Sequence, residues 1–184
     1  MKDILKQIMM VEIQDNAILM HSYRYRENDL ITLWFCHGYG LQKALLRRQQ
    51  KRHYELDLYS INVLQMKKSS SSESDLHWVN NIEPVKRFTQ SRSDYSKLLI
   101  SSYFGSLIEY WVDLNQAEEE LYKLFERALH YIDDQTVEWK AVTYFERELS
   151  RILGYGNNPT SLMRLYTASK KNQDLRARIQ HILV

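Results

Sequence analysis

The hydrophobic pattern of the chain changes its period near residue 90, and this change limits the folds that the sequence can adopt. Before it, polar turns separate short apolar runs that are rich in β-branched and aromatic residues, as is typical of strands. These runs occupy residues 17–23, 29–36, 41–46, 54–66 and 76–82. Five strands of this length predict a small closed β-barrel.

After residue 90 the apolar residues recur with the period of an amphipathic helix, in stripes over residues 95–111, 121–132 and 137–153. Asn115 and Glu118 have the spacing of a capping box before the second helix. Gly154 is expected to end the third helix in the left-handed conformation. Asn158 and Pro159 are expected to open a fourth helix, and residues 174–184 to form a last one. The sequence therefore predicts an α+β fold with a barrel first and helices second.

The stretch HGYGLQKALLRRQQKRHYEL at residues 37–56 allows two interpretations. Its Leu, Gln, Lys, Ala and Arg residues favour a basic helix. Strand-like runs flank it, however, and Gly38 and Gly40 suit a tight hairpin turn with positive φ. We therefore expect a turn, a strand at residues 41–46 and a cationic loop at residues 47–53. The serine-rich run at residues 67–75 is expected to be a mobile hairpin loop rather than a domain linker.

Several classes of site have no sequence support. The single cysteine, Cys36, excludes an internal disulfide and the zinc sites that need two or four cysteines. The six histidines lack ligand spacing, so no metal site is expected. No nucleotide-binding or hydrolase motif occurs, and the three carboxylates of AEEEL diverge by about 100° each on a helix. We expect no enzyme activity and no cofactor. Because no apolar window is long enough for a membrane span, we also expect no membrane contact.

The formal net charge of +2 is unevenly distributed. Residues 41–53 contain five cations and no acid, whereas residues 109–138 contain nine acids and two cations. One surface of the protein should therefore attract polyanions.

Two parts of the sequence carry a resemblance to the RecO family of bacterial recombination mediators. AILMHSYRYRENDLITLWFCHGYGLQKALLRR resembles the opening strands of that family, with an acid-rich turn and then a glycine turn. YSKLLISSYFGSLIEYW and FERELSRILGYG resemble its first long helix and a later helix that stops at LGYG. The resemblance covers most of residues 17–156. The basic loop is shorter than is usual in the family, and a chain with one cysteine has no zinc knuckle.

The resemblance implies an N-terminal OB-fold-like five-stranded β-barrel followed by an all-α helical domain. We expect an N-terminal extension at residues 1–16, the barrel at residues 17–88 and the helical domain at residues 89–184. The family implies a non-enzymatic protein that binds single- and double-stranded DNA and anneals complementary strands. It also implies contact with the single-strand DNA-binding protein and action with RecR to load RecA during gap repair. The expected location is the bacterial cytoplasm, in association with the nucleoid.

DNA binding requires cations for the phosphates and, on single strands, aromatic faces for the bases. The cations predicted to bind DNA are Arg24, Arg26, Lys43, Arg47, Arg48, Lys51, Arg52, Lys86, Arg87 and Arg92. The tyrosines predicted to stack on bases are Tyr25, Tyr39 and Tyr54. At least one of Trp34 and Phe35 should belong to the core. A groove for the tail of the single-strand binding protein is predicted in the helical half, at Tyr110, Trp111, Lys140, Arg147 and Arg151.

Two other functions fit the sequence. The barrel of a helical interaction adaptor would bind protein instead of DNA, and a carboxylate-metal nuclease would collect Asp and Glu from different elements. Arg147 and Arg151 have an alternative role as well, because they are spaced to pair with Glu148 on their own helix.

Overall fold

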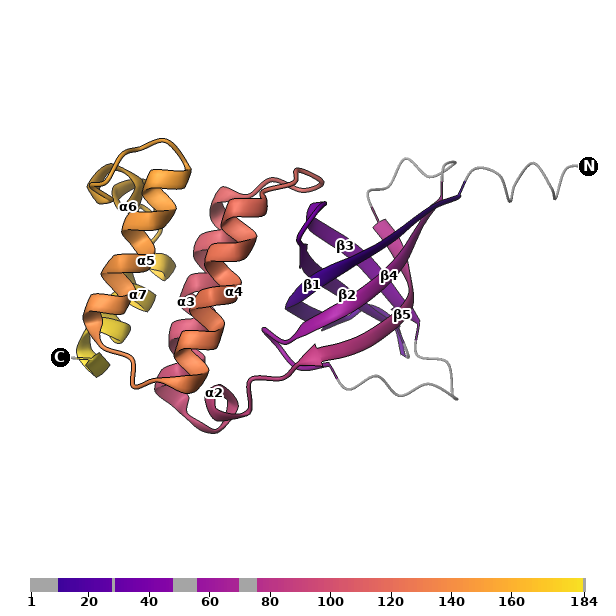
Figure 1. Cartoon of the computed structure of the whole chain (residues 1–184), viewed down its shortest axis with the longest axis horizontal. Coiled ribbons are helices and arrows are strands. Elements are labelled where there is room, and N and C mark those ends of the chain that lie inside the picture. The colour runs from indigo at the N-terminus through magenta and orange to yellow at the C-terminus, as the bar shows by residue number, and fades with distance from the viewer. Residues whose placement is uncertain (1–9, 28, 48–55, 70–75, 184) are drawn as a thin grey trace, which may run out of the picture. The chain divides into compact units, whose positions relative to one another are not determined.

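A computed structural model describes residues 10–27, 29–47, 56–69 and 76–183 (Figure 1). The chain divides into two compact units. The barrel unit comprises the chain up to Arg87 together with Asp113–Glu118, and the helical unit comprises Phe88–Val112 and the chain from Glu119 onward.

Five strands close into a barrel in the order β1-β2-β3-β5-β4. They are β1 (Met10–Arg24), β2 (Asp29–Cys36), β3 (Gly40–Arg47), β4 (Ile61–Ser69) and β5 (Leu76–Lys86). β3 and β5 pair in parallel, whereas the other neighbours pair antiparallel. This topology confirms the predicted OB-fold-like barrel and places residues 41–46 in a strand. β4 and β5 pair as the predicted hairpin requires, but residues 70–75 lie outside the described residues.

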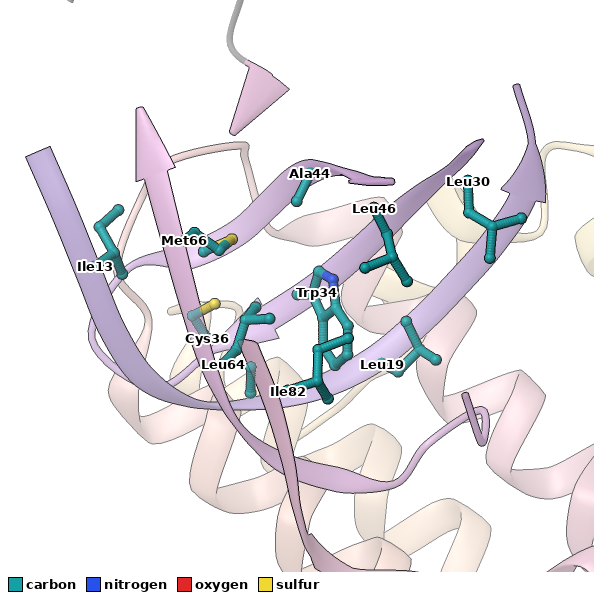
Figure 2. Close-up of a cluster of buried hydrophobic side chains, with 11 residues drawn as sticks. Ile13, Leu19, Leu30, Trp34, Cys36, Ala44, Leu46, Leu64, Met66 and Ile82 are labelled. Atoms are coloured by element: carbon teal, nitrogen blue, oxygen red, sulfur yellow. The ribbon is translucent and has the colours of Figure 1, made fainter. Parts of the chain in front are cut away.

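Alternate residues of the strands fill the barrel with apolar side chains (Figure 2). Trp34 lies among them and is fully buried. Its indole Nε1 donates to Thr32 Oγ1 at 2.7 Å, and that hydroxyl donates to the carbonyl of Ala44 at 3.0 Å. The polar side-chain atoms of Trp34 and Thr32 are thereby satisfied within the core. Phe35 is also fully buried, so both aromatic residues of this strand are core residues.

Three strands differ in length from the prediction. β1 begins at Met10 instead of residue 17, and Met10 already pairs with Ser69 of β4. Residues 10–16 were expected to precede the barrel, but Ile13 fills its core while Glu12 and Gln14 are exposed, which is the alternation of a half-buried strand. β4 spans Ile61–Ser69 instead of residues 54–66, so residues 67–69 of the predicted loop belong to the strand. β5 extends to Lys86 instead of residue 82.

The β2–β3 hairpin contacts the short segment Asp113–Glu118. Gly40 has the predicted positive φ of +66°, whereas Gly38 does not. A Cβ on Gly40 would lie 1.7 Å from the carbonyl oxygen of Gln116. The backbone N–H of Asn115 donates to the carbonyl of Leu41 at 2.9 Å. Asn115 adopts a φ of 63° and does not cap a helix, so the predicted capping box is wrong.

The helical unit contains six helices among its described residues (Figure 1). They are α2 (Thr89–Ser93), α3 (Tyr95–Trp111), α4 (Glu119–Asp134), α5 (Trp139–Ile152), α6 (Thr160–Tyr166) and α7 (Lys170–Leu183). All but the short α2 were predicted. The carboxylate of Asp94 caps α3 by accepting from the backbone N–H groups of Ser96 and Lys97.

The end of α5 confirms the predicted glycine stop. Gly154 has a φ of +80°, and its N–H donates to the carbonyl of Arg151 at 3.1 Å. The N–H of Tyr155 donates to the carbonyl of Ser150 at 2.9 Å, which completes a Schellman motif.

Aromatic side chains form the centre of the helical unit. The rings of Phe104 on α3 and Phe145 on α5 stack with their centroids 3.9 Å apart. The predicted stripes also included Tyr95 and Tyr144, but both are exposed. α3 packs against α2, α4 and α7, so its buried arc is broader than one stripe. No described helix has both the length and the apolar content that a membrane span requires.

Candidate nucleic-acid interface and partner pocket

The turn between β1 and β2 carries two of the predicted DNA-binding cations, Arg24 and Arg26. Both are exposed, as is Tyr25 between them. The N–H of Tyr25 donates to the carbonyl of Asp29 at 3.0 Å, which closes the turn. The guanidinium carbon of Arg26 lies 5.2 Å from the centroid of the Tyr25 ring, within the range of a cation–π contact.

β3 adds two further cations to the same part of the barrel. Lys43 and Arg47 are exposed while Ala44 and Leu46 between them fill the core, so the two cations share the outer face of β3. Arg47 pairs with Asp29 at the start of β2. Arg24 pairs with the next residue of β2, so Arg24 and Arg47 lie at the same end of β2 but on opposite sides of the sheet.

The other predicted cations are placed differently. Lys86 ends β5. It lies eight residues beyond Trp78, where β5 pairs with Leu45 of β3, and eight residues span about 26 Å along a strand. Arg87 Nε lies 3.6 Å from the mostly buried Asp57 carboxylate, so its charge is partly neutralised. Arg92 belongs to α2 of the helical unit. The remaining predicted residues, Arg48, Lys51, Arg52 and Tyr54, lie outside the described residues.

Exposed aromatic residues accompany the cations of the barrel. Tyr39, which was predicted to stack on bases, is exposed in the β2–β3 turn, and Tyr23 is exposed on β1. Sequence reasoning missed Trp78 on β5. Its neighbour His77 is buried, whereas the Trp78 side chain faces outward, and the guanidinium carbon of Arg47 lies 4.3 Å from the centroid of the Trp78 ring. The available signal was the alternation of LHWVNNI, which places adjacent residues on opposite faces.

A cavity of about 460 Å³ opens within the helical unit, between α3, α4 and α5. It is lined by Phe104, Leu124, Arg127, Ala128, Tyr131, Ile132, Val137, Lys140, Ala141, Tyr144 and Phe145. Two cations, Arg127 and Lys140, are therefore the charged groups of a mainly apolar cavity. We call it the helical pocket.

Lys140 is the one residue of the predicted partner groove that lines the helical pocket. Tyr110 instead packs on the ring of Tyr166, with centroids 5.5 Å apart. Trp111 packs on Tyr155. Arg147 lies over the ring of Tyr144, and Arg151 Nε donates to Glu148 Oε2 at 3.0 Å. Arg147 Nε also lies 3.7 Å from Glu148 Oε1, so the alternative pairing of both arginines with Glu148 is the observed one. The structure does not gather the five predicted residues.

A carboxylate-metal nuclease requires acidic side chains that gather around a metal ion. Within the part of the chain that the structure describes, no three His, Cys, Asp or Glu side chains form a group that could hold a metal ion. Glu119 and Glu120 lie in the first turn of α4, where acids favour the helix dipole.

Comparisons with known proteins match both units to one family. Residues 9–88 match the family model described as Recombination protein O N terminal, and residues 92–162 match Recombination protein O C terminal. The first match includes residues 10–16 of β1.

Curated relatives give the same result. A DNA repair protein RecO from Desulfatibacillum aliphaticivorans is 25% identical over 134 residues, covering 70% of this chain and 51% of the relative. The corresponding protein of Clostridium novyi is 23% identical over 141 residues, covering 76% and 55%. That of Francisella tularensis subsp. novicida is 29% identical over 143 residues, covering 75% and 58%. The chain therefore spans about half the length of the curated relatives it matches.

Proposed function

Because the chain belongs to the RecO family of DNA repair proteins, we propose that it is a non-enzymatic DNA-binding recombination mediator. It anneals complementary single strands and helps RecA replace the single-strand DNA-binding protein in gap repair. It acts in the bacterial cytoplasm on nucleoid DNA. Membership in the family supports RecR as its partner.

One observation carries the proposal of DNA binding: Lys43 and Arg47 are exposed on the same face of β3, and the exposed residues Arg24 and Arg26 lie at the end of β2 where Arg47 pairs. In OB-folds the face of the second and third strands and the adjoining loops bind oligonucleotides. Guanidinium groups fit phosphate oxygens in a bidentate manner. A phosphate backbone that runs along the outer face of β3 toward the β1–β2 turn would therefore meet Lys43, then Arg47 and then the cations of the turn.

The salt dependence of binding tests this proposal. Fluorescence anisotropy with a labelled single strand should show log affinity falling linearly with log salt. The double variant Arg24→Ala, Arg47→Ala should bind more weakly and reduce the slope by about 0.7 for each lost contact. Lys123→Ala, which removes an exposed cation of the helical unit, is the control and should leave the slope unchanged. Binding that does not respond to salt would rule out the phosphate interface.

The activity itself is tested with complementary oligonucleotides coated by the cognate single-strand DNA-binding protein. The chain should accelerate annealing, and the Arg24→Ala, Arg47→Ala variant should lose most of the acceleration. Absence of DNA binding would favour the interaction adaptor, and magnesium-dependent cleavage would favour the nuclease.

We further propose that the helical pocket binds the tail of the single-strand DNA-binding protein. Its apolar lining suits an apolar peptide, and Arg127 suits the acids of such a tail. Lys140 forms an ion pair with Glu138 at 2.8 Å and would exchange that partner for an acid of the tail. Ala141→Leu, which fills the pocket, should abolish binding of a tail peptide and leave DNA affinity unchanged. Arg164→Glu removes an exposed cation on α6 that does not line the pocket, and it is the matched control. Equal losses in the two variants would contradict this placement.

A further inference from the structure

One row of paired residues crosses four strands on the outer face of the barrel. Tyr23 on β1 pairs with Ile31 on β2, Ile31 with Leu45 on β3, and Leu45 with Trp78 on β5. Directly paired residues point to the same side of a sheet. Ala44 and Leu46, which flank Leu45, point into the core, so this outer row points away from it.

The outer row has exposed aromatic ends and an apolar middle. Tyr23 is 53% exposed and Trp78 is 45% exposed, whereas Leu45 is buried. Tyrosine and tryptophan rings supply flat faces on which bases stack without regard to sequence. The two rings are three strand spacings apart, about 14 Å along the curved sheet, so each would accept a different base.

Arg47 connects the outer row to the cations of the interface. Its guanidinium lies over the Trp78 ring at 4.3 Å, a distance at which the positive charge is attracted to the indole face. This contact restricts the Trp78 side chain. A guanidinium whose flat face stacks on an aromatic ring has its N–H groups around its edge, where they can donate hydrogen bonds to phosphate oxygens. Arg47 and Trp78 are thus arranged to contact the phosphate and the base of one strand together.

We propose that the outer row is a base-stacking platform that makes the barrel select single strands over duplex, with Trp78 as its main stacking residue. The inference rests on the proposed DNA binding and adds the source of strand selectivity. In a duplex the faces of the bases are covered by neighbouring bases, so no base face is available to stack on the Trp78 ring. The cations of the β1–β2 turn meet phosphates in either form of DNA and give no such preference.

The test compares Trp78→Ala with Trp78→Phe on a single strand of about 16 nucleotides, the upper end of an OB-fold site, and on a duplex of the same length. Trp78→Ala should weaken single-strand binding about tenfold or more and leave duplex binding unchanged. Trp78→Phe should retain most of the affinity. Tyr144→Ala is the matched control, because Tyr144 is an exposed aromatic residue beneath an arginine in the helical unit. It should change neither affinity.

A strand that lacks bases isolates the stacking contribution. The wild-type protein should bind an abasic oligonucleotide more weakly than a thymidine oligonucleotide, and Trp78→Ala should bind the two equally. Circular dichroism checks that the variants fold; if Trp78→Ala is unfolded, Tyr23→Ala at the other end of the row provides the same comparison. Equal losses on single strand and duplex, or no loss, would overturn the inference while DNA binding stands. Absence of DNA binding by the wild-type protein would overturn the proposed function and this inference with it.

Discussion

Arg176 on α7 and Glu146 on α5 form a bidentate ion pair, with Nε and Nη2 donating to the two carboxylate oxygens at 2.8 and 3.0 Å. Glu146 is almost completely buried and also accepts from the hydroxyl of Tyr103 at 2.5 Å. Arg176 in turn lies 5.1 Å from the ring centroid of Trp139. The C-terminal helix is therefore attached to the helical unit by a polar contact as well as by Ile179.

Loss of Arg176 should destabilise the helical unit. Arg176→Ala leaves the Glu146 carboxylate buried without its cation, and removing one partner of such a pair costs about 3 kcal/mol. Arg176→Lys keeps the positive charge and should recover part of this loss. The recovery should be incomplete, because lysine cannot form the bidentate pair. Urea unfolding followed by circular dichroism measures the change. Arg178→Ala, an exposed position on the same helix, should have little effect; an equally small effect of Arg176→Ala would show that the pair does not stabilise the fold.

Gly40 should be far less tolerant of substitution than Gly154. Both have positive φ, but a Cβ on Gly40 would lie 1.7 Å from the carbonyl oxygen of Gln116, whereas a Cβ on Gly154 meets no atom within 4 Å. Gly154→Ala should therefore cost only the conformational penalty of about 1–2 kcal/mol. Gly40→Ala must also displace the Asp113–Glu118 segment and should cost more. Thermal unfolding of the two variants gives the comparison, and similar melting temperatures would refute it.

Stability should fall as the pH rises above about 8. Burial raises the pKa of the Cys36 thiol, and burial together with the charge of Glu146 raises the pKa of Tyr103. Burial likewise raises the pKa of Tyr166. Each group keeps its proton in the folded protein at a pH where the unfolded chain has released it, so rising pH favours unfolding.

Urea unfolding at a series of pH values measures this dependence. The free energy of unfolding should be constant with respect to these three groups below pH 8 or so and should decline above it. Cys36→Ala should remove the earliest part of the decline, since the thiol has the lowest ordinary pKa of the three. A decline of unchanged slope in that variant would exclude the thiol as a cause.

Among the cations, Arg47 and Arg87 should contribute differently to DNA affinity. Arg47 is exposed beside the β1–β2 turn, whereas Arg87 is partly neutralised by Asp57. Arg47→Ala should reduce the salt slope by about 0.7, and Arg87→Ala should change it less. The same anisotropy titrations decide this, and a larger effect of Arg87 would move the DNA path toward the end of β5.

The change of hydrophobic period was sufficient to predict both units, because the burial that shapes a strand or a helix repeats within a few residues. Asn115 shows where such local reasoning ends. Its spacing to Glu118 fits a capping box, but its N–H donates to Leu41, which is remote in sequence, and this contact goes with a left-handed conformation. Local propensity and a tertiary contact disagree here, and the tertiary contact prevails.

The candidate site was predictable as a set of cations but not as an arrangement. Arg47 and Trp78 meet because β3 and β5 pair in parallel, and the sequence does not reveal that register. The helical pocket has a similar origin, since the spacing of Tyr110 and Trp111 on α3 does not show which sides of the helix its neighbours cover. Lys140 was found because it happens to lie on the side of α5 that lines the cavity.

The Asp113–Glu118 segment makes the barrel unit discontinuous along the chain. The polypeptide completes five strands, forms α2 and α3, and then returns to place Leu114 beside Leu41. A fragment cut after residue 88 would contain every strand and yet lack the donor that satisfies the Leu41 carbonyl, with Gly40 left uncovered. Dissection of this protein at the apparent boundary would therefore yield an incomplete barrel, whereas adding back a peptide that spans residues 113–118 should restore what is missing.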